Sequence, residues 1–276
     1  RIVIVYKDEG NSNYGTAVVG TISGTSISFG TPVVYSSSNQ SVNNIVKYSP
    51  TAEKVLVVYR DVGDSNKGKA LVGTVSNTSI SFGSAAQFAS DASQVSVAYI
   101  TTADKFCIYY FDNSGSYPNR HTEAVIATIS GTSVSFGSVN QISPTSSGAG
   151  DMPNYGRAVY DTKNDKMIFT WAESSNGGHA VVGTVSGTSI SVGSETIFDT
   201  DPIDSDIGVV FDENVGKVLI FYRQSVSGTR LRKFVIGTVS GTSISFNTSD
   251  DFGPNVGSAS KLTTVYDSVS KRVVIA

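Results

Sequence analysis

Short apolar runs separated by polar turns recur along the whole chain, and this pattern predicts β-strands. The run from Val55 to Tyr59 is apolar at every position, which suits a strand buried on both faces and is too short for a core helix. The segment from Ser79 to Phe82 alternates instead, so that Ile80 and Phe82 face a core while the serines face water. The pattern indicates an all-β protein.

One eleven-residue phrase occurs five times, in forms such as GTISGTSISFG and GTVSNTSISFG. The copies start at Gly20, Gly73, Ala127, Gly183 and Gly237, which are 53, 54, 56 and 54 residues apart. A near-fixed period of this length is typical of modules that bury their apolar faces only against neighbouring modules. We therefore expect residues 1–276 to form a single domain of five repeats of about 54 residues.

Each unit carries four strand signals, which we name A to D in chain order. In one unit, strand A ends at Tyr48, strand B covers 54–59, strand C covers 70–76 and strand D covers 79–82. Strands C and D are joined by Gly-Thr or Asn-Thr, a two-residue turn that needs a residue tolerant of positive φ. Four antiparallel strands per unit predict a β-propeller of five blades, whereas a β-solenoid, the rival fold, has shorter rungs.

The two ends of the chain bear on how the ring closes. The last A strand together with B, C and D of residues 1–29 would complete a fifth blade and leave no exposed sheet edge. The tail 271–276, however, repeats the role of residues 1–6, so the alternative is part of a six- or seven-bladed ring. Because both ends interrupt the repeat, we expect the chain to be a segment of a longer protein.

The loops predict which face binds a ligand. The A–B and C–D turns are short or nearly uniform, whereas the B–C and D–A loops vary in length and chemistry and lie together on the opposite face. Variable loops on a rigid scaffold usually carry recognition. We call this the variable-loop face.

An aromatic residue ends strand B in each unit, and a polar or acidic residue follows two positions later. These pairs are Tyr6/Asp8, Tyr59/Asp61, Tyr110/Asp112, Trp171/Glu173 and Tyr222/Gln224. A ring of such residues could stack on sugars and accept hydrogen bonds from their hydroxyl groups. The alternative is that the aromatics pack between blades and the acids cap turns.

A second set of residues stands five positions before the aromatic of strand A, where the chain would enter the central funnel. It comprises Asn43, Gln94, Tyr155, Asp206 and Lys261, which differ from unit to unit. Any ligand there would meet an asymmetric site. Our candidate ligand-binding residues are the first four aromatic–acid pairs together with Tyr155 and Asp206.

Composition excludes several classes of function. A net charge of −3 without a dense basic cluster makes nucleic acid an unsuitable partner, and no apolar run is long enough to span a bilayer. The chain has no nucleotide-binding or nucleophile-elbow motif. We expect Cys107 to be a buried thiol, His121 and His179 to be solvated loop residues, and the acidic stretch 199–206 to be an exposed loop. No cofactor and no metal are therefore predicted.

The carboxylates occupy equivalent repeat positions, whereas a glycosidase needs its two catalytic acids in unlike environments. The sequence therefore predicts a protein that is not an enzyme. A propeller glycosidase using acids such as Asp8, Asp61, Asp112 and Glu173 is the enzymatic alternative.

The repeated phrase joined to a VVYRD-like strand resembles repeat propellers of phage tail-fibre and adhesin-like surface proteins. The resemblance covers all five units and brings no catalytic motif. It implies an extracellular or virion-surface module that binds glycans or a cell-surface receptor. A structural building block of a fibre or virion is the alternative function.

Overall fold

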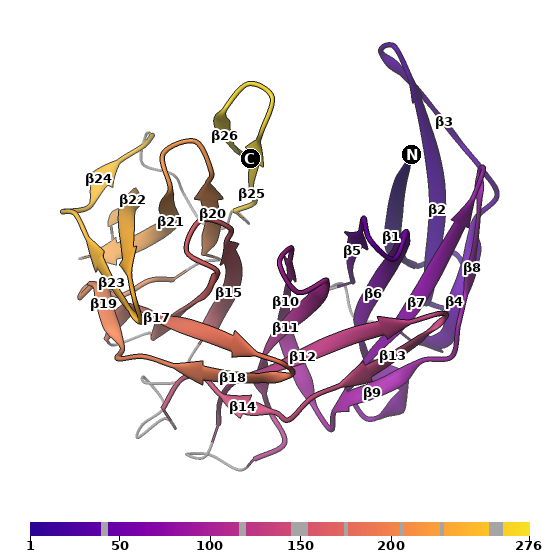
Figure 1. Ribbon diagram of the computed structural model, residues 1–276, viewed down its shortest axis with the longest axis horizontal. Coiled ribbons are helices and arrows are strands. Elements are labelled where there is room, and N and C mark those ends of the chain that lie inside the picture. The colour runs from indigo at the N-terminus through magenta and orange to yellow at the C-terminus, as the bar shows by residue number, and fades with distance from the viewer. Residues whose placement is uncertain are drawn as a thin grey trace.

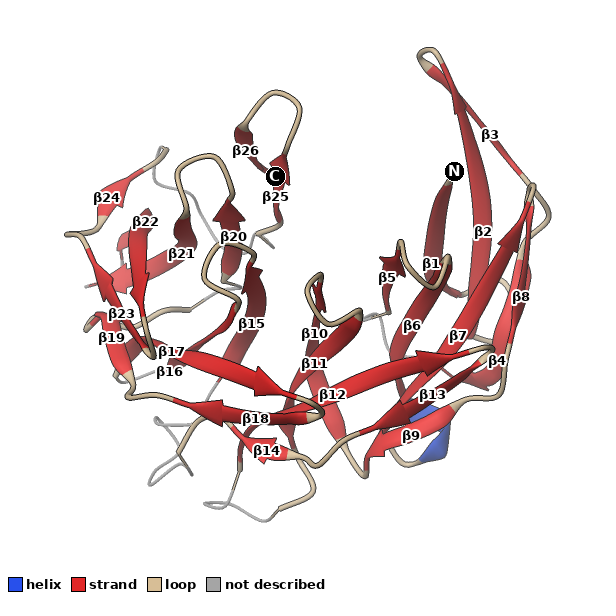
Figure 2. Ribbon diagram, viewed as in Figure 1, coloured by secondary structure: helices blue, strands red, loops and turns tan. Residues whose placement is uncertain are grey.

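The chain forms antiparallel sheets arranged around a central axis (Figure 1). The computed structural model describes residues 1–39, 44–115, 120–144, 154–173, 176–204, 207–226, 229–253 and 262–276. Nearly all regular structure in these ranges is strand, and the one helical element in them is the short 3-10 turn η1 (Val62–Asp64) (Figure 2). The predicted all-β propeller fold is confirmed.

The strands fall into six sheets, numbered here in chain order. The first contains β1 (Ile2–Asp8), β2 (Tyr14–Ser23), β3 (Ser26–Phe29) and β4 (Val33–Asn39). The second contains β5 (Ile45–Ser49), β6 (Lys54–Asp61), β7 (Lys67–Ser76), β8 (Ser79–Phe82) and β9 (Ala86–Ala89). The third contains β10 (Ala92–Ile100), β11 (Lys105–Asp112), β12 (His121–Ser130), β13 (Ser133–Phe136) and β14 (Asn140–Gln141).

The remaining sheets continue the series. The fourth contains β15 (Asn154–Asp161), β16 (Lys166–Glu173), β17 (Gly177–Ser186), β18 (Ser189–Val192) and β19 (Thr196–Asp199). The fifth contains β20 (Gly208–Asp212), β21 (Lys217–Val226), β22 (Thr229–Ser240), β23 (Ser243–Phe246) and β24 (Asp250–Asp251). The sixth contains β25 (Thr264–Asp267) and β26 (Arg272–Ile275).

Strands A to D are present in the predicted order, and strand D of the second sheet has the predicted bounds, Ser79–Phe82. The structure adds one strand to each of the first five sheets, because the outer strand continues as a second piece and both pieces pair with strand C. In the second sheet β7 pairs with β8 through Gly73–Ser76 and with β9 through Gly68–Ala70. The C–D turns have the predicted positive φ, for example 53° at Asn77 and 62° at Gly131.

The hydrophobic core lies between neighbouring sheets rather than in one central layer. One cluster joins the second and third sheets and includes Leu56, Val72, Phe106 and Tyr110. Equivalent clusters join the third to the fourth sheet and the fourth to the fifth. Cys107 lies in this core, and burial raises the pKa of its thiol well above the usual range, as expected of an unreactive thiol.

The ends of the chain do not close the ring in the way that the sequence suggested. β25 pairs with β26 across Thr264–Ile275 and Asp267–Arg272, and among the described residues β1 pairs only with β2. The termini lie on either side of an opening in the arc (Figure 1). The predicted completion of a fifth blade by β25 is therefore wrong, because the tail 271–276 supplies β25 with a partner of its own. The blade count of the ring stays a prediction.

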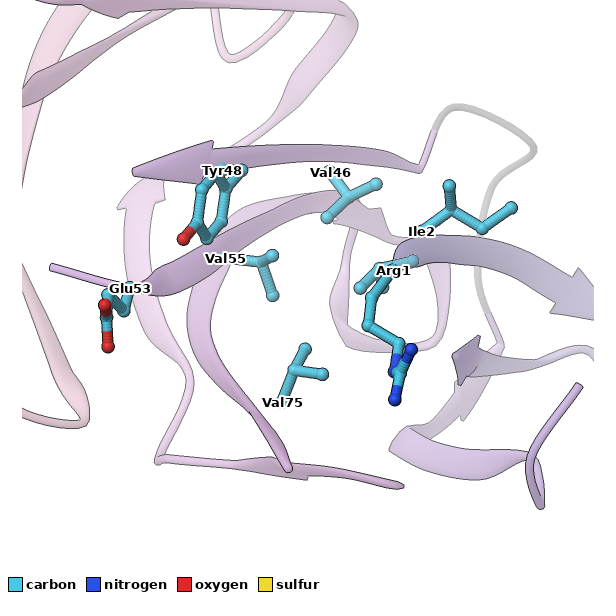
Figure 3. A pocket seen from close by; sticks show the side chains of 8 residues that line it. Arg1, Ile2, Val46, Tyr48, Glu53, Val55 and Val75 are labelled. Atoms are coloured by element: carbon cyan, nitrogen blue, oxygen red, sulfur yellow. The ribbon is translucent and has the colours of Figure 1, made fainter. Parts of the chain in front are cut away.

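A hollow of about 700 Å3 lies beside β1, where the first sheet has no strand at the inner position (Figure 3). It is lined mainly by apolar side chains from the first two sheets, including Ile2, Val46, Val55 and Val75. Arg1, Tyr48 and Glu53 also line it, and we assign no site to this hollow. In the described part of the chain no helix is long and apolar enough to cross a membrane.

Candidate functional site in the central channel

The inner strands β5, β10, β15, β20 and β25 surround a channel along the axis of the molecule. At its variable-loop end, where these strands begin, the channel contains a cavity of about 380 Å3. We call it the loop-side cavity. A second cavity of about 470 Å3 lies at the other end, and Lys47, Ala158 and Thr264 line both. The loop-side cavity is large enough for a small sugar or sugar acid.

The loop-side cavity is cationic. Lys47 and Arg157 line it, and no carboxylate belongs to its described lining. The Lys47 side chain is exposed to solvent within the channel. The protein around it nevertheless removes part of the hydration of its ammonium group, and this desolvation lowers the pKa of Lys47. Two positive charges in one small cavity favour an anionic ligand or a transition state that develops negative charge.

Polar groups of the cavity complement these cations. The side-chain amide of Asn44 is buried at both its nitrogen and its oxygen and has no hydrogen-bond partner. A buried amide without a partner is unfavourable, and a ligand that satisfies it gains affinity. Ser96 Oγ accepts a hydrogen bond from the Ala158 amide at 3.1 Å, which positions the hydroxyl group for donation to a ligand.

Two inner strands carry a β-bulge at the mouth of the channel. Gln94 has φ of 50° and Tyr155 has φ of 55°, and the ladder register shifts at both places. The Tyr155 amide donates to Gln94 Oε1, which links the two strands. Left-handed backbone at residues other than glycine is often found at functional sites, and bulges redirect the side chains that follow them. Here those side chains include Ser96 and Arg157.

The aromatic residues of the predicted ring lie elsewhere. Tyr59, Tyr110, Trp171 and Tyr222 are 0–2% exposed and belong to the clusters between sheets, whereas Tyr6 is partly exposed. The ring faces of these four are covered by protein and do not form a platform for a sugar in this conformation. Packing between blades, the alternative that the sequence left open, describes their positions.

The polar residues that follow these aromatics have hydrogen-bond partners in their own and in neighbouring sheets, and Ser38 of the first sheet donates to Asp61 Oδ1. Asp61 accepts from Lys69 Nζ at 2.8 Å and, as the N-cap of η1, from the amide of Asp64, the last residue of that element. Asp112 accepts from both the amide and the hydroxyl of Ser114. Gln224 donates to Asp199 and Asp201. These residues do not line the loop-side cavity, so the structure does not bring them together with Lys47 and Arg157.

Glu173 belongs to a buried polar cluster. It accepts from Trp171 Nε1 at 3.2 Å and from Asn176 Nδ2 at 3.0 Å, and His179 Nε2 lies 3.7 Å from Glu173 Oε2. The other ring nitrogen, His179 Nδ1, lies 2.5 Å from Glu195 Oε1. The prediction that the histidines are solvated loop residues is wrong, since His179 is 4% exposed within β17 and His121 begins β12. The contact with Glu195 compensates for the burial of His179 Nδ1, whereas His179 Nε2 has no hydrogen-bond partner among the described residues.

The acidic stretch is also less exposed than expected. Asp204 pairs with Arg223 Nε at 2.7 Å and Arg230 Nε at 3.0 Å. Asp199 accepts from the Tyr222 hydroxyl at 2.6 Å. Desolvation opposes ionisation of Asp204, but the two arginines outweigh it and hold the pKa of this carboxyl below its usual range.

Three of the predicted entrance residues, Asn43, Asp206 and Lys261, lie outside the described residues. Of the candidate ligand-binding residues, Tyr155 is the one described at the start of an inner strand; it packs against the cluster between the fourth and fifth sheets and does not line the loop-side cavity. Asp8, in the first sheet, is partly exposed. Lys47, Arg157, Asn44 and Ser96 were not identified as candidates from the sequence.

The sequence does carry a signal for two of these residues. Lys47 stands where the other units have Ala98, Val159, Val210 and Val265. Arg157 stands where they have Ile45, Ser96, Gly208 and Thr263. Departures from the repeat within strand A therefore mark the lining of the channel.

Two solved structures support the fold. A periplasmic gluconolactonase from Pseudomonas aeruginosa matches with a TM-score of 0.65 and 12% identity, over 99% of this chain and 74% of that chain. A protein named as a 6-phosphogluconolactonase from Bacteroides uniformis matches with a TM-score of 0.54 and 9% identity, over 91% of this chain and 68% of that chain. At these identities the likeness establishes the propeller fold alone.

An exo-β-1,3-galactanase from Phanerochaete chrysosporium matches more distantly, with a TM-score of 0.47 and 9% identity, over 92% of this chain and 55% of that chain. This similarity is too low to carry an argument. No protein-family model and no curated protein matches the chain. Neither of the two lactonase structures is named as a tail fibre or an adhesin, so only the propeller part of that resemblance is supported.

The comparisons overturn the expectation that the chain is not an enzyme, because the propellers that share its fold are named as enzymes. That expectation rested on the equivalence of the carboxylates in the repeat. In the structure these carboxylates have different surroundings, since Asp61 lies beside Lys69 whereas Glu173 lies beside His179. The chain is a β-propeller of a fold that includes gluconolactonases, and unlike side chains meet in its central channel.

Proposed function

We propose that this propeller is a hydrolase of a small sugar-derived ester, a sugar lactone, and that the loop-side cavity is its active site. The observation that carries the proposal is the convergence of Lys47, Arg157 and the unpartnered Asn44 amide in a cavity of about 380 Å3. Hydrolysis of a lactone gives a hydroxy acid, whose carboxylate is a ligand for such a cationic cavity. The names of the two matched propellers agree with this substrate class.

The proposed chemistry needs few groups. Water adds to the carbonyl carbon of the lactone, the ring C–O bond breaks, and the proton lost by the water reaches the leaving alkoxide. Arg157 stabilises the oxyanion that forms at the carbonyl oxygen. Lys47, whose lowered pKa leaves more of its amine neutral than in an ordinary lysine, takes the proton from the water and returns it. Asn44 and Ser96 hold the hydroxyl groups of the sugar.

A lactone fits this cavity better than a glycoside does. Glycoside hydrolysis normally requires two carboxylates, and no carboxylate belongs to the described lining of the loop-side cavity. The proposed ligand is still derived from a carbohydrate, as the sequence predicted. We propose that it is hydrolysed rather than only bound. We also propose a location outside the cytoplasm, in line with the periplasmic location in the name of the Pseudomonas protein.

The test is an assay of the purified chain on glucono-1,5-lactone and its 6-phosphate, corrected for spontaneous hydrolysis, with p-nitrophenyl glycosides alongside. We expect turnover of a lactone and none of the glycosides. Arg157→Gln should lower kcat/KM by about 100-fold, the magnitude typical of a lost oxyanion donor. Lys7→Met, which removes a partly exposed lysine that does not line the loop-side cavity, is the charge-matched control for Lys47→Met.

The pH dependence identifies the role of Lys47. Because a lysine is neutral above its pKa, kcat/KM should rise with pH through a value below the ordinary lysine range of about 10.4, and Lys47→Met should remove this rise. Absence of lactone turnover above background would contradict the proposal. Equal kcat/KM in the wild type, Lys47→Met and Arg157→Gln, all shown to be folded by circular dichroism, would refute the assigned site.

A further inference from the structure

Four chemically active side chains share one face of the ladder between β11 and β12. Asp112 lies directly opposite His121, and Tyr110 lies directly opposite Glu123. Opposite residues in a ladder, and residues two positions apart in a strand, project on the same side of the sheet. Single ligand atoms of Asp112, His121 and Glu123 accordingly lie within 4.8 Å of one another.

The second sheet shows what normally occupies this place. There Lys67 lies opposite Asp61 and Lys69 lies opposite Tyr59, at the same register positions. Lys69 Nζ lies 2.8 Å from Asp61 Oδ2 and 2.6 Å from Asp64 Oδ2, so an ammonium group balances the carboxylates. In the third sheet His121 and Glu123 replace these two lysines, while the acid is retained as Asp112.

The replacement leaves an excess of negative charge. On this face His121 Nε2 lies 3.1 Å from Glu123 Oε1. Even a protonated His121 would balance only one of the two carboxylates. Asp112 is 9% exposed, and uncompensated charge at such burial is unfavourable. A cation supplied from solution would restore the balance that the lysines provide in the second sheet.

The geometry also provides access and orientation. A pocket of about 260 Å3 opens onto the face and is lined by Tyr110, Asp112 and Glu123, with Ser90 contributed by the second sheet. The Tyr110 hydroxyl donates to Glu123 Oε2 at 2.7 Å and thereby orients that carboxylate. Ser114 donates to both oxygens of Asp112. The pocket leaves room for water ligands on the open side of the cluster.

We infer that Asp112, His121 and Glu123 bind a divalent transition metal ion at the seam between the second and third sheets, with Zn2+ as the ion that fits best. One imidazole nitrogen and two carboxylate oxygens are ligands that zinc accepts, whereas Ca2+ and Mg2+ prefer oxygen alone. Three protein ligands with an open position are the arrangement found where zinc also binds water. This site is separate from the loop-side cavity and does not depend on the proposed lactonase activity.

The test is calorimetric titration of the metal-free protein with Zn2+, and with Ca2+ and Mg2+ for comparison. We expect one Zn2+ per chain, a Zn2+-dependent rise in Tm because the ion binds only the folded ladder, and much weaker binding of Ca2+ and Mg2+. His121→Gln and Glu123→Gln should each weaken Zn2+ binding by about tenfold or more. Glu123→Gln retains an acceptor for Tyr110 and therefore tests the ligand with the least disturbance of the fold.

The chain has two histidines, and this makes His179→Gln a matched control. Zn2+ binding that persists in His179→Gln and is lost in His121→Gln would support the inference. No binding to the wild type, or binding that is lost in His179→Gln and kept in His121→Gln, would overturn it. Binding left intact by Glu123→Gln and His121→Gln, each shown to be folded by its thermal transition, would overturn it equally.

Discussion

Residues at equivalent places in the repeat differ in chemistry because their partners across the ladder differ. Asp61 faces two lysines, Asp112 faces His121 and Glu123, and Glu173 contacts His179. The sequence identified these acids and the aromatics before them. It could not assign their roles, since these depend on the register of strand C and on burial between sheets, and neither can be read from one strand alone.

The ion pairs of Asp204 yield a prediction at this scale. Because Arg223 and Arg230 hold its pKa below the usual value, the stabilisation is present above the unfolded-state pKa of about 3.9 and is lost as pH falls through the folded-state pKa. Asp204→Asn should therefore lower Tm at about pH 7, and the difference from the wild type should shrink at about pH 2.5. Thermal melts at both pH values check this.

Glu9→Gln is the control for that comparison, because the Glu9 side chain is 78% exposed and its pair with Lys7 contributes little. A Tm difference for Asp204→Asn that is the same at both pH values would show that the arginine pairs are not its source.

At the scale of the elements, the repeated phrase joins neighbouring sheets. A Cβ atom at Gly83 would lie 1.9 Å from the carbonyl oxygen of Thr132, in the C–D turn of the next sheet. The same close approach joins Gly30 to Thr78, Gly137 to Thr188 and Gly193 to Thr242. Strand positions followed from the apolar pattern, but the break in each outer strand was missed, because it depends on contact with the neighbouring unit.

Gly83→Ala should therefore destabilise the protein by about 1–3 kcal/mol or more, since backbone must move to make room for the methyl group. Chemical unfolding monitored by circular dichroism measures this. Gly253→Ala is the matched control, because its nearest neighbour, Arg232 Cδ, would lie 3.5 Å from the new Cβ, an ordinary contact. Equal unfolding free energies for the two variants would show that the contact between turns does not constrain the sheets.

For the molecule as a whole, the site arises from strands distant in the sequence. Lys47 comes from β5 and Arg157 from β15, and only the curvature of the arc brings them to one cavity (Figure 1). The loop-side cavity lies at the variable-loop face, the end of the molecule where the sequence predicts recognition. The convergence of Lys47 and Arg157 was not predicted, because each strand A, taken by itself, was interpreted as a packing strand.

We propose the central channel, rather than the carboxylates between blades, as the place where a sugar acid binds. Hydrogen–deuterium exchange with and without D-gluconate, the product of gluconolactone hydrolysis, tests this claim most directly. We predict protection of the first residues of β5, β10 and β15, which is lost in Arg157→Gln. Protection confined to the ends of β6, β11 and β16, where Asp61, Asp112 and Glu173 lie, would contradict it.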